Sequence, residues 1–194
     1  MQQIIEFIIE IDKLKNVTRK TKPIGGDRYE NPAEHSWQIA LLAAAMQRYA
    51  DAPVDIDRVI LMLLLHDIGE IDTGDTIFYA EEGLADRKAA ERGCVTRIFD
   101  NLEEPQRSQF LSLWDEFDHN TTPESRFAHA CDRAMPVLLN LHNNGQSWRE
   151  NGITLERIVS RVSPPIRQGC PALWDYIETR LEEEARKGWF VTTT

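Results

Sequence analysis

The sequence predicts an all-α fold, a single domain built as a bundle of about six to nine helices. Three observations lead to this prediction. Apolar residues recur with helical spacing along most of the chain, capping residues and prolines stand where helices should begin, and strand-like runs are nearly absent. With 194 residues, the chain is long enough to bury one hydrophobic core without disulfide support.

The first third of the chain contains the clearest helix signals. An amphipathic helix is predicted over 3–15, and a basic loop follows that is longer than usual, which is typical of a functional loop. Asn31 is a capping residue, Pro32 suits the first helical position, and Glu34 completes a capping box. A second helix is therefore predicted to begin here and to run to Tyr49.

A third helix is predicted to begin after its capping residue Asp55 and to run to about Asp67. Its apolar run, Val59–Leu65, is typical of a helix that is buried on all sides. The dipeptide His66-Asp67 therefore lies at the end of a rigid, buried element.

The remaining helices are predicted from periodicity and from prolines at first helical positions. One short β-like run, Thr76–Tyr79, is interpreted as an extended loop or a helix start. Pro164 and Pro165 are expected to end the helix that begins at Thr154. The predicted ranges are 84–102, 106–117, 122–140, 154–162 and 171–187.

Composition excludes several classes of function. The chain has 22 basic and 32 acidic residues, a net charge of −10, which opposes nucleic-acid binding. No apolar run approaches the ~20 residues of a membrane span. An acidic protein can still bind a small phosphorylated substrate through a metal and local arginines, and residues 15–28 form such a basic island. Three widely spaced cysteines and an amino-terminal segment without a basic leader predict reduced thiols in the cytoplasm.

Four residues form a candidate metal site. His35 lies in the first turn of the second predicted helix, and His66-Asp67 ends the third. Antiparallel neighbours joined by a short link bring the start of one helix beside the end of the other, so these side chains can meet. Asp132, an acid among core residues of a later helix, is the best fourth ligand. Imidazole and carboxylate groups are ligands of divalent metals.

Each of these residues also has a simpler explanation. Buried histidines are often satisfied by a neighbouring acid, and Asp132 and Arg133 could form a surface ion pair. Glu70 and Asp75 could be solvated loop acids. His129 lies one turn before Asp132 and is interpreted as a core histidine whose hydrogen bonds are satisfied.

The pattern His35 … His66-Asp67 … Asp132 resembles the signature of the HD-domain metal-dependent phosphohydrolases. The segment Arg28–Ser36 is similar to the R-x-E-N-x-x-E-H-S stretch of the small HD-domain 5′-deoxynucleotidases, and HDIGE and TGD resemble their next two motifs. The closing PALW segment resembles a bacterial branch of HD-domain hydrolases. The resemblance implies one HD domain over 1–194, with a metal-binding core at about 31–140, and a homodimer.

The resemblance also implies a role for each residue. Glu70 would move the proton of the attacking water or of the leaving group, and Asp75 would orient water or a sugar hydroxyl. Arg19 would bind the phosphate, with Arg28 as a second candidate that could instead pair with Glu30 or Glu34. One divalent ion (Mn, Co, Fe, Zn, Ni or Mg) would be held by His35, His66, Asp67 and Asp132.

The predicted function is hydrolysis of the phosphate monoester of (deoxy)nucleoside 5′-monophosphates by a metal-activated water. Lys20 and Thr21 follow Arg19 where the deoxynucleotidases have an aromatic residue, so the sugar preference stays open. One alternative is a pyrophosphohydrolase acting on guanosine tetraphosphate-type nucleotides. Another is a non-catalytic helical module that binds a metal or nucleotide, which Glu70 and Asp75 argue against because a structural metal would not need them.

Overall fold

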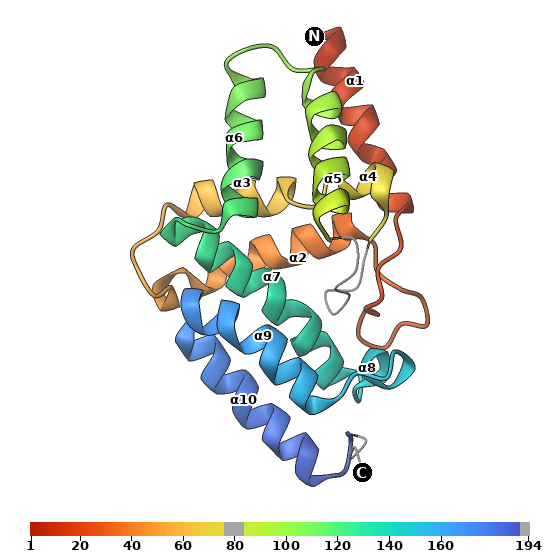
Figure 1. Cartoon of the computed structure of the whole chain (residues 1–194), viewed down its shortest axis with the longest axis vertical. Coiled ribbons are helices and arrows are strands. Elements are labelled where there is room, and N and C mark those ends of the chain that lie inside the picture. The colour runs from red at the N-terminus through yellow and green to blue at the C-terminus, as the bar shows by residue number, and fades with distance from the viewer. Residues whose placement is uncertain (76–83, 191–194) are drawn as a thin grey trace.

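The computed structural model describes residues 1–75 and 84–190, and this part of the chain contains helices and loops without a strand, which confirms the all-α prediction (Figure 1). None of its helices combines the length and the apolar character that crossing a membrane requires. The α-helices are α1 Gln2–Ile11, α2 Pro32–Met46, α3 Ile56–Leu65, α4 Glu70–Thr73, α5 Leu84–Phe99, α6 Gln106–His119, α7 Pro123–His142, α8 Gln146–Glu150, α9 Leu155–Gly169 and α10 Pro171–Arg186, with 3₁₀ turns η1 Asp12–Asn16 and η2 Gln47–Tyr49.

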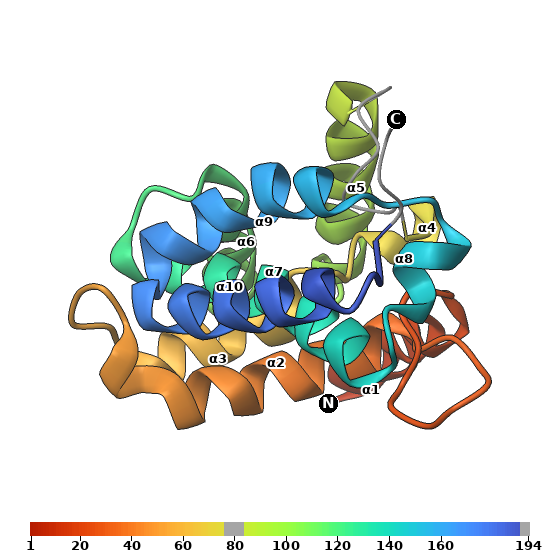
Figure 2. The same cartoon turned by 90° about the horizontal axis from the view of Figure 1, so that it is seen from below.

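The helices form two groups on either side of a central pair. Helices α2 and α3 lie side by side across the middle of the molecule, with α1, α5 and α6 above them in Figure 1. Helices α7, α9 and α10 lie below and pack against one another (Figures 1 and 2). Because α7 contacts both α2 and α3, the start of α2, the end of α3 and the middle of α7 meet at one place.

Side-chain caps fix where the central helices begin. The Asn31 side chain accepts the Glu34 N–H at 3.0 Å, and the Glu34 carboxylate accepts the Asn31 N–H at 3.2 Å, which completes the predicted capping box. Asp55 accepts the first free N–H groups of α3. Thr122 caps α7, and Ser125 completes its capping box. These local bonds set the helical phase that aims the functional side chains inward.

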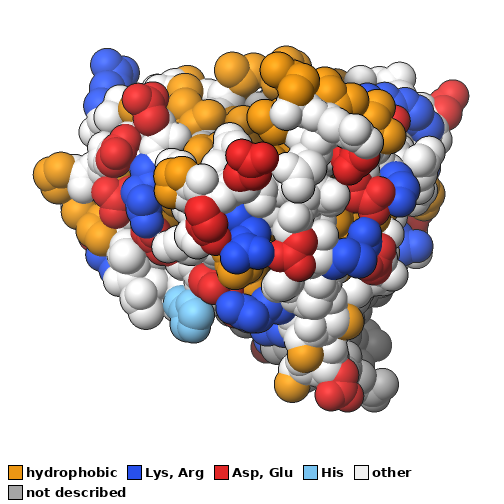
Figure 3. Space-filling model, turned by 90° about the horizontal axis from the view of Figure 1, so that it is seen from above, with side chains coloured by type: hydrophobic (Ala, Val, Ile, Leu, Met, Phe, Trp, Pro, Cys, Tyr) orange, Lys and Arg blue, Asp and Glu red, His pale blue; other side chains and the backbone are white. Residues whose placement is uncertain are grey.

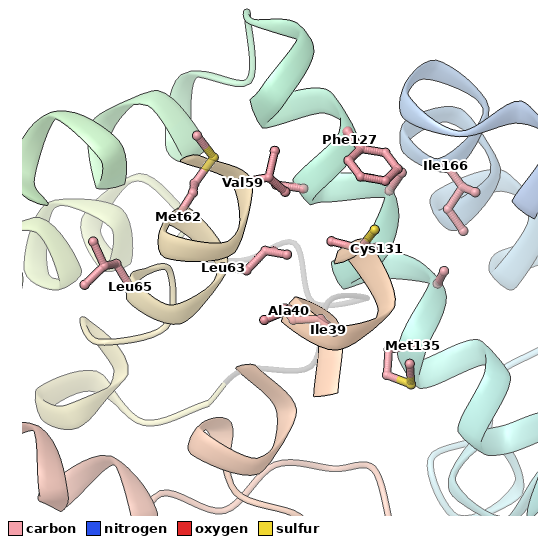
Figure 4. Packing of buried hydrophobic residues seen from close by; sticks show 14 of the residues in the cluster. Ile39, Ala40, Val59, Met62, Leu63, Leu65, Phe127, Cys131, Met135 and Ile166 are labelled. Carbon is pink, nitrogen blue, oxygen red and sulfur yellow. The ribbon is translucent and has the colours of Figure 1, made fainter. Parts of the chain in front are cut away.

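The core is built where the helices cross. Figure 4 shows Ile39 of α2, Leu63 of α3 and Phe127 and Cys131 of α7 lying around one space, with Ile166 of α9 nearby. Each of these side chains is at most 1% exposed. Burial of such apolar surface contributes roughly 25 cal/mol per Å². The functional side chains of α2, α3 and α7 therefore stand on a tightly packed scaffold.

The predicted end of the helix that begins at Thr154, which is α9 in the structure, is wrong. Helix α9 continues through Pro164 and Pro165 to Gly169, although proline removes a backbone donor. Its apolar stripe, which includes the fully buried Ile158 and Ile166, packs against α7 and α10 and offsets that loss. A Cβ on Gly169 would lie 2.1 Å from the Arg126 carbonyl oxygen, so the end of α9 lies directly on the backbone of α7. The predicted β-like run at 76–79 lies outside the described residues.

Candidate metal centre

Three side chains from three helices converge on one point. His35 comes from the first turn of α2, His66 follows the last residue of α3, and Asp132 comes from the middle of α7. One ligand atom from each lies within 4.8 Å of the others, and all three residues are buried. The atoms His35 Nε2 and Asp132 Oδ1 are 2.9 Å apart. Two imidazoles and a carboxylate at this spacing can bind one divalent cation.

His66 points its Nε2 atom at the carboxylates of this centre, where the neutral imidazole could act as a metal ligand. Its Nδ1–H donates to the Leu63 carbonyl at 2.8 Å, which leaves the lone pair on Nε2. Nε2 is buried without a hydrogen-bond partner and lies 2.9 Å from Asp67 Oδ1 and 3.8 Å from Asp132 Oδ1. Trp114 Nε1–H donates to the His66 carbonyl at 3.0 Å and holds this turn in place. A buried, unpartnered nitrogen that faces two carboxylates fits a shared cation.

The protonation of the centre also suits metal binding. Burial, together with the nearby Arg19 charge, lowers the pKa of His35 to about 4, so its imidazole is neutral at physiological pH. Burial raises the pKa of Asp132, but Arg133 and the two histidines more than offset that effect and hold the pKa well below its usual range. His35 and Asp132 therefore offer a neutral imidazole and an ionised carboxylate. At His66 burial lowers the pKa, but the charges of Asp67 and Asp132 outweigh it and raise the pKa, so a metal would displace a proton there.

Asp67 stands at the edge of this group and joins it to Arg19. The Arg19 Nη1–H donates to Asp67 Oδ2 at 3.1 Å, and Nη1 lies 3.5 Å from Asp75 Oδ1. Arg19 Nε–H donates to the buried Glu30 at 3.0 Å. The backbone repeats this pairing, because the Arg19 N–H donates to the Glu30 carbonyl and the Glu30 N–H donates to the Thr21 carbonyl. The basic loop is thus tied to the segment before α2, which fixes the guanidinium beside the centre.

Glu70 and Asp75 lie in the same acidic environment. Burial, reinforced by the negative charges of Asp67 and Asp75, raises the pKa of Glu70 to about 10. Its Oε2 atom is buried without a hydrogen-bond partner. Burial also raises the pKa of Asp75, although Arg19 opposes this shift. A carboxyl group that keeps its proton at neutral pH can act as a general acid.

The centre opens into a cavity of about 420 Å³. Its walls include His66, Asp67, Glu70, Asp75 and Asp132. Despite the acidic charge of the whole chain, six basic side chains also line it: Arg19, Lys20, Arg87, Lys88, Arg133 and Arg161. Two further acids, Glu91 and Asp118, also line it, so acidic and basic side chains are equal in number, and binding of an anionic ligand would depend on a bound cation as well as on Arg19.

Arg28 is not brought to this cavity. Its guanidinium is exposed at the surface and donates to both carboxylate oxygens of Glu34, at 2.8 and 2.6 Å. Its phosphate-binding role therefore stays a prediction. His129 borders the cavity, but its Nε2–H donates to the Phe117 carbonyl at 2.8 Å and its ring stacks on Phe117. Its Nε2–H therefore has a hydrogen-bond partner within the protein, as expected for a core histidine.

Sequence reasoning missed two supporting residues. Glu30 is 3% exposed and anchors Arg19, and its Oε1 lies 3.9 Å from His35 Nδ1. Trp114 supports the His66 turn through the bond from its indole N–H to the His66 carbonyl. A signal existed for Glu30, because the R-x-E-N-x-x-E-H-S stretch contains it at a matching position. No local pattern in the sequence indicates the Trp114 contact.

Comparison with known proteins agrees with this geometry. The HD domain family model matches residues 11–174. The 5′-deoxynucleotidase HDDC2 of Danio rerio is 22% identical over 187 residues, covering 96% of this chain and 90% of that protein. A 5′-deoxynucleotidase of Enterobacter sp. (strain 638) is 31% identical over 128 residues, covering 62% of this chain and 63% of that protein.

Solved structures show the same fold. The crystal structure of a predicted metal-dependent phosphohydrolase from Magnetospirillum magnetotacticum MS-1 is 37% identical, with a TM-score of 0.91, and the match covers 98% of this chain and 97% of that one. A conserved hypothetical protein from Pyrococcus furiosus, 20% identical with a TM-score of 0.58, shares the fold alone. The protein therefore belongs to the HD-domain family of metal-dependent phosphohydrolases.

Proposed function

We propose that this protein hydrolyses the phosphate monoester of nucleoside 5′-monophosphates, with deoxyribonucleotides among its substrates. The observation that carries the proposal is the buried His35, His66 and Asp132 group, of which His66 and Asp132 line one cavity together with Glu70 and Arg19. Relatives named 5′-deoxynucleotidases support the choice of substrate. We propose that the whole chain forms one HD domain and works in the cytoplasm, where its three buried, unbridged cysteines would stay reduced.

We propose that His35, His66, Asp67 and Asp132 hold one divalent ion, for which Mn, Co, Fe, Zn, Ni and Mg are all candidates. When bound, such an ion polarises phosphoryl oxygens and lowers the pKa of water. The residues fit this role because the buried His66 Nε2 faces two carboxylates without a hydrogen bond.

The remaining residues have separate tasks in this proposal. Arg19, held by Glu30, would bind the phosphate with its planar guanidinium. Glu70, buried beside Asp67, would transfer the proton of the attacking water or of the leaving oxygen. Asp75 would orient the attacking water or a sugar hydroxyl. Arg28 would have to leave Glu34 before it could contact a phosphate.

The test is phosphate release from a panel of ribo- and deoxyribonucleoside 5′-monophosphates. Metal-stripped protein would be resupplied with Mn²⁺, Co²⁺ or Mg²⁺ and compared with Glu70→Ala and Asp67→Ala, with the surface change Asp100→Ala as a matched control. Metal-dependent release that both site variants lose, and the control keeps, is the expected result. Tight metal binding without release would contradict the proposal, and guanosine tetraphosphate-type nucleotides would then be the next substrates to assay.

We also propose a homodimer, supported by an apolar face on the side of the molecule where α1, α2 and α3 lie together (Figure 2). Hydrophobic side chains gather at the edge of the molecule where α1 lies (Figure 3). The face carries seven large hydrophobic side chains that are 44–65% exposed, and exposed apolar patches of this kind mark interaction surfaces. Its large exposed members are Ile4, Ile5, Ile8, Ile9, Trp37, Leu41 and Leu64.

A second copy of this chain suits the face better than a lipid surface. Each chain carries a net charge of −10, so two copies repel each other where their acidic residues meet. The uncharged side chains of this face allow contact without that repulsion. The lysines beside α1, Lys13 and Lys15, are paired with Glu10 and Asp12. Light scattering after size exclusion is expected to give a dimer for the wild type and for Tyr176→Glu on α10, and a monomer for Ile9→Glu and Trp37→Glu. A monomeric wild type would contradict the dimer.

A further inference from the structure

The cavity beside the metal centre has an end of a different character. Pro136 and Val137 of α7 form one wall, and Trp148, Ile153 and Val162 form the other. Except for Pro136, these side chains are at most 8% exposed. An apolar end of this kind favours an apolar or aromatic group of a small ligand, while the polar end fixes its orientation.

The two ends lie along one helix. Asp132 belongs to the metal centre, and Pro136 follows it by four residues on the same side of α7. Val137, about 140° round the helix from Asp132, also lines the cavity. At 1.5 Å per residue, Val137 lies roughly 7 Å further along the helix axis than Asp132. In a nucleoside 5′-monophosphate the whole sugar separates the phosphate from the base. A phosphate at the metal centre would therefore place the base against Val137 and the facing wall.

The Trp148 ring is held in position before any ligand arrives. Its backbone N–H donates to Asn140 Oδ1 at 3.3 Å, and its ring centre lies 5.6 Å from that of Phe190. Two polar groups at this end are already used within the protein. Asn140 Nδ2–H donates to the Pro136 carbonyl, and the Ser147 hydroxyl donates to the Lys20 carbonyl. This end therefore provides mainly contact with apolar side chains, and the charged Arg161, which precedes Val162, also lines it.

We propose that the apolar end, formed by Pro136, Val137, Trp148, Ile153 and Val162, binds the base of the nucleotide substrate. This inference rests on the proposed function, because it takes the phosphate to bind at the metal centre. It predicts that the base raises kcat/KM mainly through van der Waals contact with these apolar side chains. A sugar phosphate without a base should therefore be a poor substrate.

The experiment compares two pairs of substrates that differ only in the base. These are deoxyadenosine 5′-monophosphate against 2-deoxyribose 5-phosphate, and adenosine 5′-monophosphate against ribose 5-phosphate. In the better sugar series, the wild type is expected to prefer the nucleotide at least about tenfold in kcat/KM, as stacking and burial of a base imply.

Val137→Phe narrows the apolar end and is expected to lower kcat/KM for the nucleotide about tenfold or more, while hydrolysis of the sugar phosphate changes less than about twofold. Leu138→Phe is the matched control, because Leu138 is the next residue of α7 and does not line the cavity. It should change neither substrate. If Val137→Phe does not fold, Ile153→Phe narrows the same space from the opposite wall.

Calorimetric titration with deoxyadenosine and adenosine, which carry no phosphate, separates this inference from the proposed function. If no phosphate ester is hydrolysed but a nucleoside binds to the wild type and to Leu138→Phe and not to Val137→Phe, the function fails and the base site stands. Equal hydrolysis of nucleotide and sugar phosphate would overturn the inference. Equal effects of Val137→Phe and Leu138→Phe would also overturn it. In a protein that hydrolyses no phosphate ester, the absence of nucleoside binding would overturn it as well.

Discussion

Charged side chains are paired in two regions of this protein, and the two differ in burial. On the surface of α5 and α6, Arg92 donates to both oxygens of Asp115 at 3.0 Å, yet the arginine side chain is 53% exposed. Beside the metal centre, Arg19 makes similar bonds to Asp67 and Glu30 while only 11% exposed. The same type of ion pair is therefore exposed to water in one region and largely shielded from water in the other.

The difference explains where function is located. An exposed pair gains little because water screens it and solvates each partner equally well alone. A buried group must be compensated by its neighbours, so its protonation depends on them. That dependence makes Glu70 hold a proton and His35 give one up. The predictions below test this contrast, from the largest expected effect to the smallest.

Asp132→Asn should have the largest effect. It removes a buried negative charge that lies 2.9 Å from His35, and with it a ligand of the proposed metal site. We expect metal-dependent phosphate release to fall at least about 10³-fold and bound metal per chain to fall in elemental analysis. The same substitution in the surface pair, Asp115→Asn, should leave both unchanged. Equal losses of phosphate release and bound metal in Asp132→Asn and Asp115→Asn would contradict the difference between the buried and the exposed region.

Glu70→Gln should lower kcat about 10²- to 10³-fold while bound metal stays near one ion per chain. The amide keeps the shape of the side chain but cannot transfer a proton. The pH profile of kcat supplies a second readout, because the wild-type profile should contain a step that the variant lacks. Unchanged kcat would show that Glu70 is only a buried acid.

Arg19→Met should raise KM for the nucleotide about ten- to a hundredfold, because a buried guanidinium that faces the cavity is lost. Arg19→Lys should recover only part of this, since a lysine cannot make the two-pronged contact. Arg28→Met, measured alongside, decides the open role of the exposed arginine. An equal rise in KM would make it a phosphate ligand, and no rise would leave it as the surface partner of Glu34.

Glu70→Gln should also change how stability depends on pH in metal-free protein. In the folded chain the pKa of Glu70 is raised by burial from 4.5 to about 10, so the folded state keeps a proton that the unfolded state releases. The wild type is therefore destabilised progressively as the pH rises from about 4.5 towards 10, whereas the glutamine variant lacks this penalty. Thermal unfolding with a chelator should give a Tm difference in favour of the variant that grows from pH 5 to pH 9. A difference that does not grow with pH would contradict the buried, protonated state.

Arg92→Met should have the smallest effect. The arginine side chain is 53% exposed and that of its partner Asp115 is 28% exposed, so we expect a Tm change of less than about 2 °C and no change in kcat or KM. Any small change in Tm should shrink further in 0.5 M salt. A loss of activity would mean that the surface of α5 and α6 is coupled to the cavity.

Local patterns were enough to predict much of the site. The caps at Asn31, Asp55 and Thr122 are short-range hydrogen bonds, so the starts of α2, α3 and α7 could be predicted from neighbouring residues. Once those starts are known, helical geometry places His35 and Asp132 on inward faces. The sequence by itself therefore determined the all-α class and the residues that meet at the centre.

Only the tertiary structure decided the features that depend on distant partners. Helix α9 continues through Pro164 and Pro165 because α7 and α10 bury its apolar stripe, and no local signal reports that gain. The bond from Arg19 to Glu30 and the apolar end of the cavity arise in the same way, from segments that meet only after folding. Burial and pKa follow from this packing, because they depend on what surrounds a group in space and not on its neighbours along the chain.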